Sequence, residues 1–324
     1  MRNLNIINQL DDYRLAGFFV LERNLFMNNF IDGHTILIGL MAYPIRHSMS
    51  PTMHNAAFQK LNLNFVYLAF DVDAEHLSDG VKAIRTLEMR GSNVSMPNKQ
   101  KIIPYLDKLD ITSELNQAVN TVVNDNGVLT GYTTDGIGFI NDLKSKGHTV
   151  SDKTILVAGA GGAGTPIAIQ SALDGASKVI IVNQHDQHWD NAKRNVEIIN
   201  QKTNSHAELF DLSDTEKFKR SLQVCDIYCD ATGVGMGKLS DVSLVNNPAW
   251  FKKDMVVFDT VYAPRETKLM KIAKQAGVKH VYNGLGMMIE QGAAAFKLWT
   301  GQDMPIDFVK QQLLEKDKAH DEAN

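Results

Sequence analysis

The segment Thr154-Ile155-Leu156-Val157-Ala158-Gly159-Ala160-Gly161-Gly162-Ala163-Gly164 carries the clearest structural signal of the chain. An apolar run leads into glycines spaced as G-x-G-x-x-G, a helix-like pattern follows over 165–172, and a second apolar run covers 178–182. In such a unit the first glycine permits a tight turn, the second lets the backbone approach a pyrophosphate, and the third lets helix pack on strand. The positive end of the helix would face the phosphates. The segment therefore predicts a dinucleotide site rather than a turn without a ligand.

The loop after the second apolar run indicates which dinucleotide is preferred. Asn183 ends that run, where Asp or Glu is usual, and Asp186 follows it. No Arg or Lys lies between Asn183 and Lys193, although a basic residue is the usual partner for the extra phosphate of NADP. A carboxylate about 4 Å from that phosphate would cost ~1–4 kcal/mol per unit charge. We therefore predict that NAD is preferred to NADP; the alternative is that Asp186 only caps the next helix.

Length and charge limit the class of protein. The 324 residues suffice for about two domains, and 44% hydrophobic residues can form ordinary cores. The net charge of −4 contains no block of like charge, so binding to nucleic acid or to a membrane surface is not expected. No apolar stretch approaches the ~18 residues of a transmembrane helix. Charged residues on both sides of the short apolar run at 15–21 argue against a secretory signal.

Cysteines and histidines indicate neither a disulfide framework nor a metal site. Cys225 and Cys229 lie in or beside one apolar run, so reduced, buried thiols in a cytoplasmic protein are expected. The ten histidines are scattered, and no pair is flanked in a way that suggests metal ligands. The sequence does not determine the oligomeric state, and a homodimer is compatible with it.

Strand and helix patterns alternate along most of the chain. The strands are expected at 35–40, 65–70, 91–95, 121–123, 128–131, 154–158, 178–182, 207–212, 226–231, 255–259 and 279–282. The helices are expected at 15–30, 52–61, 74–87, 97–106, 112–118, 136–146, 165–172, 189–200, 215–222, 266–275, 287–300 and 308–315. This alternation implies a parallel sheet with helices on both faces, and Asp125-Asn126-Gly127 predicts a hairpin turn.

The fold class predicted from these patterns is α/β with two domains. An N-terminal α/β substrate domain is expected over 34–133, completed by 288–318 from the C-terminal end. A Rossmann-type, doubly wound nucleotide-binding domain is expected over 134–287. Residues 1–33 form an extension without an evident role, and the charged residues 319–324 are expected as a frayed tail that begins near 316.

Polar residues gather in the loops that follow the expected strands of the first half, where open α/β sheets bind ligands. These loops contain Ser48, Ser50 and residues 93–99, 118–121 and 131–136. Together they supply hydroxyls, amides, one amine and one carboxylate, a set that suits a polyhydroxylated acid. They contain neither a nucleophile activated by a base nor a cluster of metal ligands.

The same loops resemble the successive motifs of the shikimate dehydrogenases. The matching segments are 39–51, 91–99, 118–121, 134–138, the glycine turn, 234–236 and 284–291. The wording at 39–48, 94–100 and 298–301 is closest to the quinate/shikimate dehydrogenase branch. The resemblance runs in order from about 36 to 313 and leaves residues 1–33 outside.

The resemblance implies a role for each matching residue on the substrate side. Lys99 and Asp135 would form the catalytic pair. The residues that would bind the substrate carboxylate and ring hydroxyls are Ser48, Ser50, Ser95, Lys99, Asn120, Asp135 and Gln291. Five of these residues have a purely structural alternative: Lys99 as a surface residue in a first helical turn, Ser50 or Asp135 as a helix cap, Asn120 as a turn residue, and Gln291 as an exposed helix residue. Met287 and Met288 are expected to pack rather than bind ligand.

On the cofactor side, the resemblance implies a set of residues around the glycine turn and the later loops. These residues are Ala160, Gly161, Gly162, Ala163, Asn183, Gln184, His185, Asp186, Thr260, Val261, Tyr262, Ala263 and Gly284. Three departures concern support of Asp135 and cofactor choice. Thr133 stands where the family often has Asn, Gly233 where the closest branch tends to have Lys, and Gln184-His185 replaces a pair that is often basic.

The implied activity is reversible hydride transfer between NAD(P) and the ring 3-hydroxyl of shikimate or quinate, giving 3-dehydroshikimate or 3-dehydroquinate. Shikimate would place the chain in aromatic amino acid biosynthesis, on the shikimate pathway to chorismate; quinate belongs more to catabolism. Two alternatives are a dehydrogenase for another substrate, such as an aminated shikimate analogue, and a catalytically weak nucleotide-binding sensor. Retention of both Lys99 and Asp135 argues against the sensor.

Overall fold

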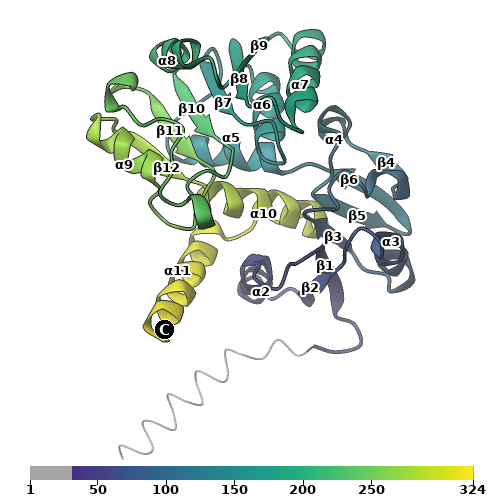
Figure 1. Cartoon of the computed structure of the whole chain (residues 1–324). Helices are drawn as coiled ribbons and strands as arrows, with labels where there is room; N and C mark the ends of the chain where they lie inside the picture. The colour runs from purple at the N-terminus through teal and green to yellow at the C-terminus, as the bar shows by residue number, and fades with distance from the viewer. Residues whose placement is uncertain (1–30, 324) are drawn as a thin grey trace, which may run out of the picture.

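The computed structural model describes residues 31–323, with the backbone alone from 316 onward. Figure 1 shows two sheets in separate halves of the molecule, with α10 (Leu285–Thr300) running between them. The two sheets and their helices confirm the predicted α/β class with a Rossmann-like half. The helix predicted at 15–30 lies outside the described residues.

The first sheet is mixed and has six strands in the order β2-β1-β3-β5-β6-β4. The strands are β1 (Ile36–Ala42), β2 (Phe65–Asp71), β3 (Gly91–Val94), β4 (Lys108–Leu109), β5 (Thr121–Asp125) and β6 (Val128–Tyr132). β1 pairs in parallel with β2 and β3, whereas β3 and β6 pair with β5 in antiparallel fashion. The carboxyl ends of β1 and β3 consequently lie side by side, and the loops after them reach the same edge of the sheet.

The predicted hairpin turn is present between β5 and β6. Asn126 and Gly127 have φ values of +53° and +91°. Positive φ at both central residues is the geometry of the two-residue turn whose twist matches that of the flanking strands. This turn fixes the register in which Thr121 pairs with Tyr132.

Helices from both ends of the chain cover the first sheet. They are α2 (Ser50–Lys60), α3 (Leu77–Thr86) and α4 (Ile111–Asn116), joined by α10 and α11 (Ile306–Ala323). Buried side chains from α2, β2 and α10 share one apolar core, which includes Phe58, Tyr67, Phe296 and Trp299. The C-terminal helices therefore pack on the same core as the first strands, while the domain limits stated above stay a prediction.

The second sheet is parallel throughout, with the order β12-β11-β10-β7-β8-β9. Its strands are β7 (Thr154–Ala158), β8 (Lys178–Asn183), β9 (His206–Asp211), β10 (Ile227–Asp230), β11 (Val256–Asp259) and β12 (His280–Asn283). Its helices are α5 (Asp135–Ser145), α6 (Gly164–Leu173), α7 (Trp189–Lys202), α8 (Thr215–Val224) and α9 (Lys268–Gln275). The strand order reverses between β7 and β10, and a doubly wound sheet binds its ligand at that switch point.

The glycine turn connects β7 to α6 as the sequence predicts. Gly159 has a φ of +96°, a conformation that favours glycine. A Cβ on Gly164 would overlap the carbonyl oxygen of Gly159, so only glycine allows this close approach of helix to strand. The first and last glycines of the motif are therefore required by the fold, which leaves the middle ones facing outward.

One predicted helix is wrong. The segment expected as a helix over 97–106 forms turns, with a single 3-10 turn at Ile103–Tyr105. Pro104 within that segment has no N–H to donate and disfavours helix in the residue before it. The carbonyl of Lys99 instead accepts a hydrogen bond from the Val119 N–H at 2.8 Å. Lys99 therefore lies in an ordered loop after β3, not in a first helical turn.

Other differences concern short elements and the C-terminal end. Strand β4 and the 3-10 turns at Gly237–Leu239 and Pro248–Trp250 were not expected. The tail expected to fray from 316 continues α11 to Ala323, because this stretch contains neither glycine nor proline and is rich in helix-forming Lys, Glu and Ala. No helix among the described residues is long and apolar enough to cross a membrane.

Candidate active site

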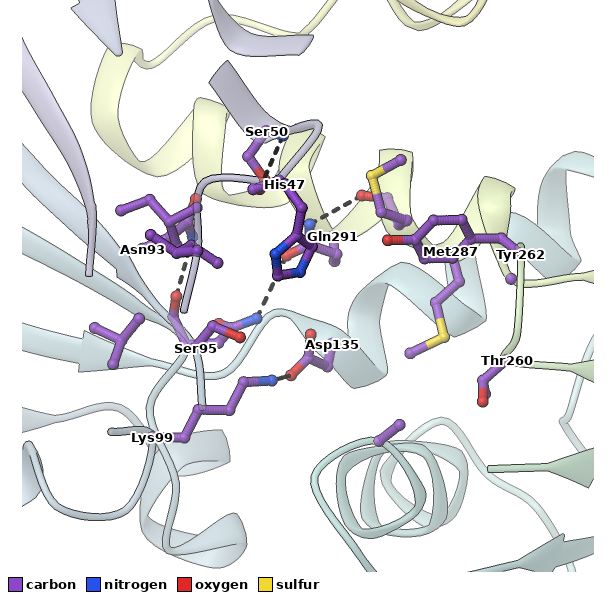
Figure 2. Close-up of a pocket in the computed structure, with 18 residues that line it drawn as sticks. His47, Ser50, Asn93, Ser95, Lys99, Asp135, Thr260, Tyr262, Met287 and Gln291 are labelled. Carbon is purple, nitrogen blue, oxygen red and sulfur yellow. Dashed lines mark hydrogen bonds and ion pairs between the residues drawn. The ribbon is translucent and has the colours of Figure 1, made fainter. Parts of the chain in front are cut away.

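A cavity of about 340 Å³ lies between the two halves, at the carboxyl ends of β1 and β3 on one side and of β11 and β12 on the other. It is lined by Leu40, Ile45, His47, Ser48, Ser50, Asn93, Val94, Ser95, Lys99, Asn120, Asp135, Ala163, Thr260, Tyr262, Gly284, Met287, Met288 and Gln291. All seven residues predicted on the substrate side therefore line one cavity. Figure 2 shows the Lys99 amine pointing at Asp135, with Ser50 and His47 on the opposite side.

The Lys99–Asp135 ion pair is the central charged feature of this cavity. Lys99 Nζ lies 2.6 Å from Asp135 Oδ2, and the two side chains are 16% and 14% exposed. Lys99 comes from the loop after β3, and Asp135 is the first residue of α5. Asp135 makes no capping bond for α5, whose N-cap is Thr134, so its carboxylate faces the cavity and Lys99 instead. The pair thus joins loops that are far apart in the sequence.

Three serines supply hydroxyl groups to the same cavity. Ser48 and Ser50 belong to the loop and first turn that lead from β1 into α2, and the Ser50 N–H donates to Ser48 Oγ at 3.2 Å. The N-cap of α2 is Met49, and no side chain caps this helix, so Ser50 is not the helix cap considered as its alternative role. Ser95 follows β3, where its N–H donates to the Met41 carbonyl at 3.1 Å. These hydroxyls are available to a ligand carboxylate.

Asn120 is held by a dense set of hydrogen bonds. Its Oδ1 accepts from the Thr134 N–H at 2.9 Å, and its Nδ2 donates to Thr134 Oγ1 at 2.9 Å. Gln291 Oε1 lies 3.5 Å from the same Nδ2, while Gln291 Nε2 donates to the Met288 carbonyl at 2.9 Å. Asn120 is 4% exposed and Gln291 half-buried. Asn120 is therefore more than a turn residue, and Gln291 is not an exposed helix residue.

Asn93 lines the cavity as well, although the sequence assigned it no role. The Tyr67 hydroxyl donates to Asn93 Oδ1 at 2.7 Å, and Asn93 Nδ2 donates to the Asn120 carbonyl and to Thr121 Oγ1, each at 3.0 Å. Burial raises the pKa of Tyr67 well above its usual value, so the hydroxyl keeps its proton. The position of Asn93 near the end of β3 could have indicated that it lines the site. Its hydrogen bond with Tyr67 could not be predicted, because Tyr67 lies on another strand outside the motif.

His47, Met287 and Met288 are further lining residues that the sequence did not place in the site. His47 precedes Ser48 within a segment that matches a family motif, and its side chain faces the cavity (Figure 2). Met287 and Met288, expected to pack, do pack against the apolar cores, and both also line the cavity. They form an apolar wall on the α10 side.

A second cavity of about 380 Å³ lies under the glycine turn. It is lined by Met96, Pro97, Lys99, Gln100, Asn116, Ala118, Gly161, Gly162, Thr165, Pro166, Gln187, His188, Asn191 and Arg194. Lys99 is common to both cavities. The glycine turn and the polar loops of the first sheet therefore meet at the catalytic candidate.

The geometry of the glycine turn fits a dinucleotide. A Cβ on Gly162 would meet no atom within 4 Å, so this backbone is open to a ligand. Helix α6 begins here with Ala163 as its N-cap, and no side chain caps it. The Thr165 N–H donates to the Gly161 carbonyl at 3.1 Å and Pro166 has no N–H, so the site offers phosphate the open backbone of the turn and the positive end of the helix.

The residues predicted on the cofactor side divide into those at the cavities and those away from them. Ala163, Thr260, Tyr262 and Gly284 line the first cavity, and Gly161 and Gly162 line the second. Ala160, Asn183, Gln184, His185, Asp186, Val261 and Ala263 line neither of these two cavities. Buried Asn183 accepts the Ala160 N–H on Oδ1 at 3.0 Å, which fastens the glycine turn to the end of β8.

Asp186 orders the loop after β8. Its Oδ1 accepts from the His188 N–H at 2.8 Å and from Asn183 Nδ2 at 3.0 Å. The hydrogen bond from the His188 backbone, with that from Asn183, holds the pKa of this carboxyl below its usual value. The N-cap of α7 is His188, so Asp186 is not the residue that caps this helix. Its carboxylate remains ionised and exposed at the end of β8.

Two of the three departures from the family pattern can be located. Thr133 donates to the Ala118 carbonyl and lies 3.1 Å from Ser113 Oγ. It thus supports the loop before Asp135 and has no bond to Asp135 itself. Gly233 has a φ of +79°, a conformation that a lysine rarely adopts. Among the described residues, no group of three or more His, Cys, Asp or Glu side chains could hold a metal ion.

Two family models match the chain. Residues 40–122 match the shikimate dehydrogenase substrate binding domain, and residues 284–314 match the shikimate 5'-dehydrogenase C-terminal domain. The chain is 55% identical over 289 residues to the shikimate dehydrogenase (NADP(+)) of Streptococcus uberis, which covers 89% of this chain and 98% of that protein. The predicted family resemblance is therefore confirmed.

Solved structures agree with the sequence relatives. A shikimate 5-dehydrogenase from Listeria monocytogenes, in complex with shikimate and NAD, has a TM-score of 0.86 at 49% identity and covers 88% of this chain and 99% of its own. A quinate dehydrogenase from Corynebacterium glutamicum, in complex with NAD, has a TM-score of 0.78 at 27% identity and covers 87% and 99%. The two-domain architecture is thus shared across nearly the whole length of these proteins.

Proposed function

The chain belongs to the shikimate dehydrogenase family, and we propose that it catalyses reversible hydride transfer between the ring 3-hydroxyl of shikimate and a nicotinamide dinucleotide. The product of oxidation is 3-dehydroshikimate, an intermediate of aromatic amino acid biosynthesis. The observation that carries this proposal is the 2.6 Å Lys99–Asp135 pair at the junction of the two cavities.

The side chains of the first cavity bind and orient the substrate. Ser48 and Ser50 donate hydroxyl hydrogen bonds to its carboxylate, while Ser95, Asn120 and Gln291 hold ring hydroxyls. A carboxylate bound by several hydroxyls and a ring fixed by amides leaves little rotational freedom, and such positioning contributes strongly to rate. This set of donors supports a polyhydroxylated acid as the substrate.

Lys99 and Asp135 exchange the proton of the reacting hydroxyl. Oxidation requires Lys99 as the neutral amine: the carbon–hydrogen bond breaks with its electron pair, the O–H proton moves to Lys99 Nζ, the C–O bond becomes a carbonyl, and the ammonium later releases its proton to solvent. The nicotinamide, when bound, supplies the hydride acceptor. Asp135 accepts a hydrogen bond from Lys99 Nζ at 2.6 Å, which fixes the nitrogen so that it can lie within the ~3 Å of the hydroxyl that general catalysis requires.

We also propose that NAD is preferred to NADP. The exposed, ionised Asp186 at the end of β8 supports this, as does the absence of Lys and Arg from 184 to 192. The names of the relatives point the other way: the proteins of Streptococcus uberis and Listeria monocytogenes are both named for NADP(+), although a Listeria monocytogenes structure contains NAD. Comparing kcat/KM for the two cofactors at saturating shikimate tests the preference, and a strong advantage of NADP would refute it.

Quinate is proposed as a second substrate. The likeness to a quinate dehydrogenase and the wording of residues 39–48 and 94–100 support it. Quinate shares the carboxylate and the ring alcohols of shikimate, so the same donors suit both. A homodimer is likewise a proposal, which sedimentation of the purified chain would test.

One assay separates the main hypotheses. Absorbance of the reduced nicotinamide is followed with NAD or NADP and with shikimate, quinate or no substrate. Turnover of shikimate well above the blank supports the proposal. Cofactor binding without turnover of either acid would favour the nucleotide-binding sensor, and turnover of an aminated analogue alone would favour the other dehydrogenase.

A further inference from the structure

The second cavity, under the glycine turn, has an unusual charge composition. Its lining residues include Lys99, Arg194 and His188 and no aspartate or glutamate. The N-termini of α6 and α7 both reach it, through Thr165 and His188. Lys99 is paired with Asp135 at 2.6 Å, so the positive dipole ends and Arg194 supply the potential that attracts an anion here. This composition suits phosphate oxygens.

Asn116 adds an observation of a different kind. It lines the same cavity and is 3% exposed, and its side-chain oxygen has no hydrogen-bond partner in the part of the chain that the structure describes. A buried polar atom without a partner is costly, so such atoms usually mark a place that a ligand or water completes. The cavity therefore suits a ligand with hydroxyls as well as phosphates, as a dinucleotide has.

His188 lies against the part of the turn that faces this cavity. A Cβ on Gly161 would be 3.8 Å from His188 Nε2, so the imidazole borders the backbone that is open to phosphate. The His188 N–H is fixed by Asp186 Oδ1 at 2.8 Å, and the ring does not cap α7. Gln187 Nε2 lies 3.4 Å from His188 Nε2, which is a long contact. The ring thus has hydrogen-bonding capacity for a ligand.

We propose that His188 is an additional hydrogen-bonding contact for the diphosphate of the dinucleotide, beside the glycine turn. The inference rests on the proposed function, because it assumes that a dinucleotide occupies the turn. A ring nitrogen that carries a proton can donate a hydrogen bond to a phosphate oxygen. The charged groups around the ring are Lys99 and Arg194 in the cavity and Asp186 on its own loop.

The test measures binding without substrate. Binding of NADH and of NADPH is followed by fluorescence with the full chain, His188→Phe, His188→Gln and the control His206→Phe, whose exposed histidine lies at the start of β9. We expect His188→Phe to weaken both cofactors about 5-fold, the scale of one hydrogen bond. His188→Gln can still donate a hydrogen bond and should keep part of the affinity, and His206→Phe should match the wild type.

Several outcomes would overturn the contact. Equal binding of both cofactors by His188→Phe and the wild type would do so. So would a loss confined to NADPH, because that pattern belongs to the ribose phosphate rather than to the diphosphate. Shikimate turnover by the wild type is measured in parallel. If the wild type turns over shikimate and His188→Phe binds both cofactors normally, the contact from His188 is refuted and the proposed function stands. A wild type that binds neither cofactor refutes the proposed function as well.

Discussion

At the scale of single residues, the reaction depends on an amine placed where the two cavities meet. We expect Lys99→Ala to lower kcat for shikimate oxidation by ~10²–10⁴, the range of general acid–base catalysis. Cofactor affinity should stay similar, because the glycine turn is untouched. The control is Lys101→Ala, which removes an exposed lysine two residues away. A Lys99→Ala enzyme that kept most of its turnover would rule out the assigned role.

Tyr67 is a positioning residue whose effect should appear in substrate binding. Its hydroxyl holds the cavity residue Asn93 at 2.7 Å, while its ring stacks on His54 with centroids 4.5 Å apart. Tyr67→Phe keeps the ring and removes the hydroxyl, which costs ~1 kcal/mol for one hydrogen bond. We expect KM for shikimate to rise about 5-fold with KM for NAD unchanged, measured by steady-state kinetics.

Exposed Tyr105 supplies the matched control, because Tyr105→Phe removes a hydroxyl outside the site. A Tyr67→Phe enzyme that lost stability in urea but kept its KM for shikimate would show that the bond is structural only.

Residue by residue, the sequence predicts the groups that end in the cavity better than the groups that hold them there. Lys99, Asp135, Asn120 and Gln291 belong to motifs with distinctive wording, so their convergence could be anticipated. Tyr67 lies on β2 within an apolar stretch, where nothing distinguishes it from a core residue. Its role depends on strand register, which no local pattern records.

At the scale of elements, the crossing of α5 and α10 brings Gln291 to the site. A Cβ on Gly138 would lie 2.7 Å from the backbone N of Gln291 and 2.8 Å from the carbonyl of Met287. Both are backbone atoms, so the helices must separate to admit a methyl group. We expect Gly138→Ala to destabilise the protein by ~1–3 kcal/mol and to raise KM for shikimate, because Gln291 moves away.

Urea denaturation and steady-state kinetics on the same preparation test this. Gly33→Ala is the control, since a Cβ at Gly33 would meet no atom within 4 Å. Unchanged stability and KM in Gly138→Ala would mean that the two helices adjust without cost.

Helix and strand positions were predictable where hydrophobic period and punctuation agree. The strand at 154–158 is a short apolar run that ends at a glycine. The turn at Asn126-Gly127 places an asparagine and a glycine where positive φ is needed. The helix predicted at 97–106 does not form. Pro97 is compatible with the start of a helix, but Pro104 interrupts one, and the prediction followed Pro97. Lys99 lies in that loop, so the error concerned an element and not the chemistry.

At the scale of the whole molecule, the Rossmann half follows from its motif, whereas the mixed order of the first sheet does not. Placing β5 beside β3 requires long-range pairing that the alternation of elements leaves open. In the second sheet, the pairing of β10 with β11 has an electrostatic consequence. Asp230 and Asp259 end neighbouring strands in register, and both are at most 2% exposed.

Burial of these two carboxyls should make global stability depend on pH. Burial, with a contribution from Asp230, raises the pKa of Asp259 to about 7, although Thr267 Oγ1 and the Val261 N–H donate to it. The folded protein therefore binds a proton between about pH 4 and 7 that the unfolded chain releases. Stability from this group is present at low pH and is lost as pH rises through 7, by up to about 4 kcal/mol.

Asp259→Asn removes that titration while keeping the shape of the side chain. The amide can still accept from the Val261 N–H and can donate to the Thr267 hydroxyl. We expect the free energy of unfolding of the variant to increase relative to that of the wild type between pH 5.0 and pH 8.5, because only the wild type loses stability over this range. Urea denaturation at both pH values measures the two free energies. Taking the difference between the two proteins cancels the titrating groups that do not interact with Asp259. A relative stability that stayed constant, or that fell as pH rose, would mean that Asp259 is ionised in the folded protein at pH 5.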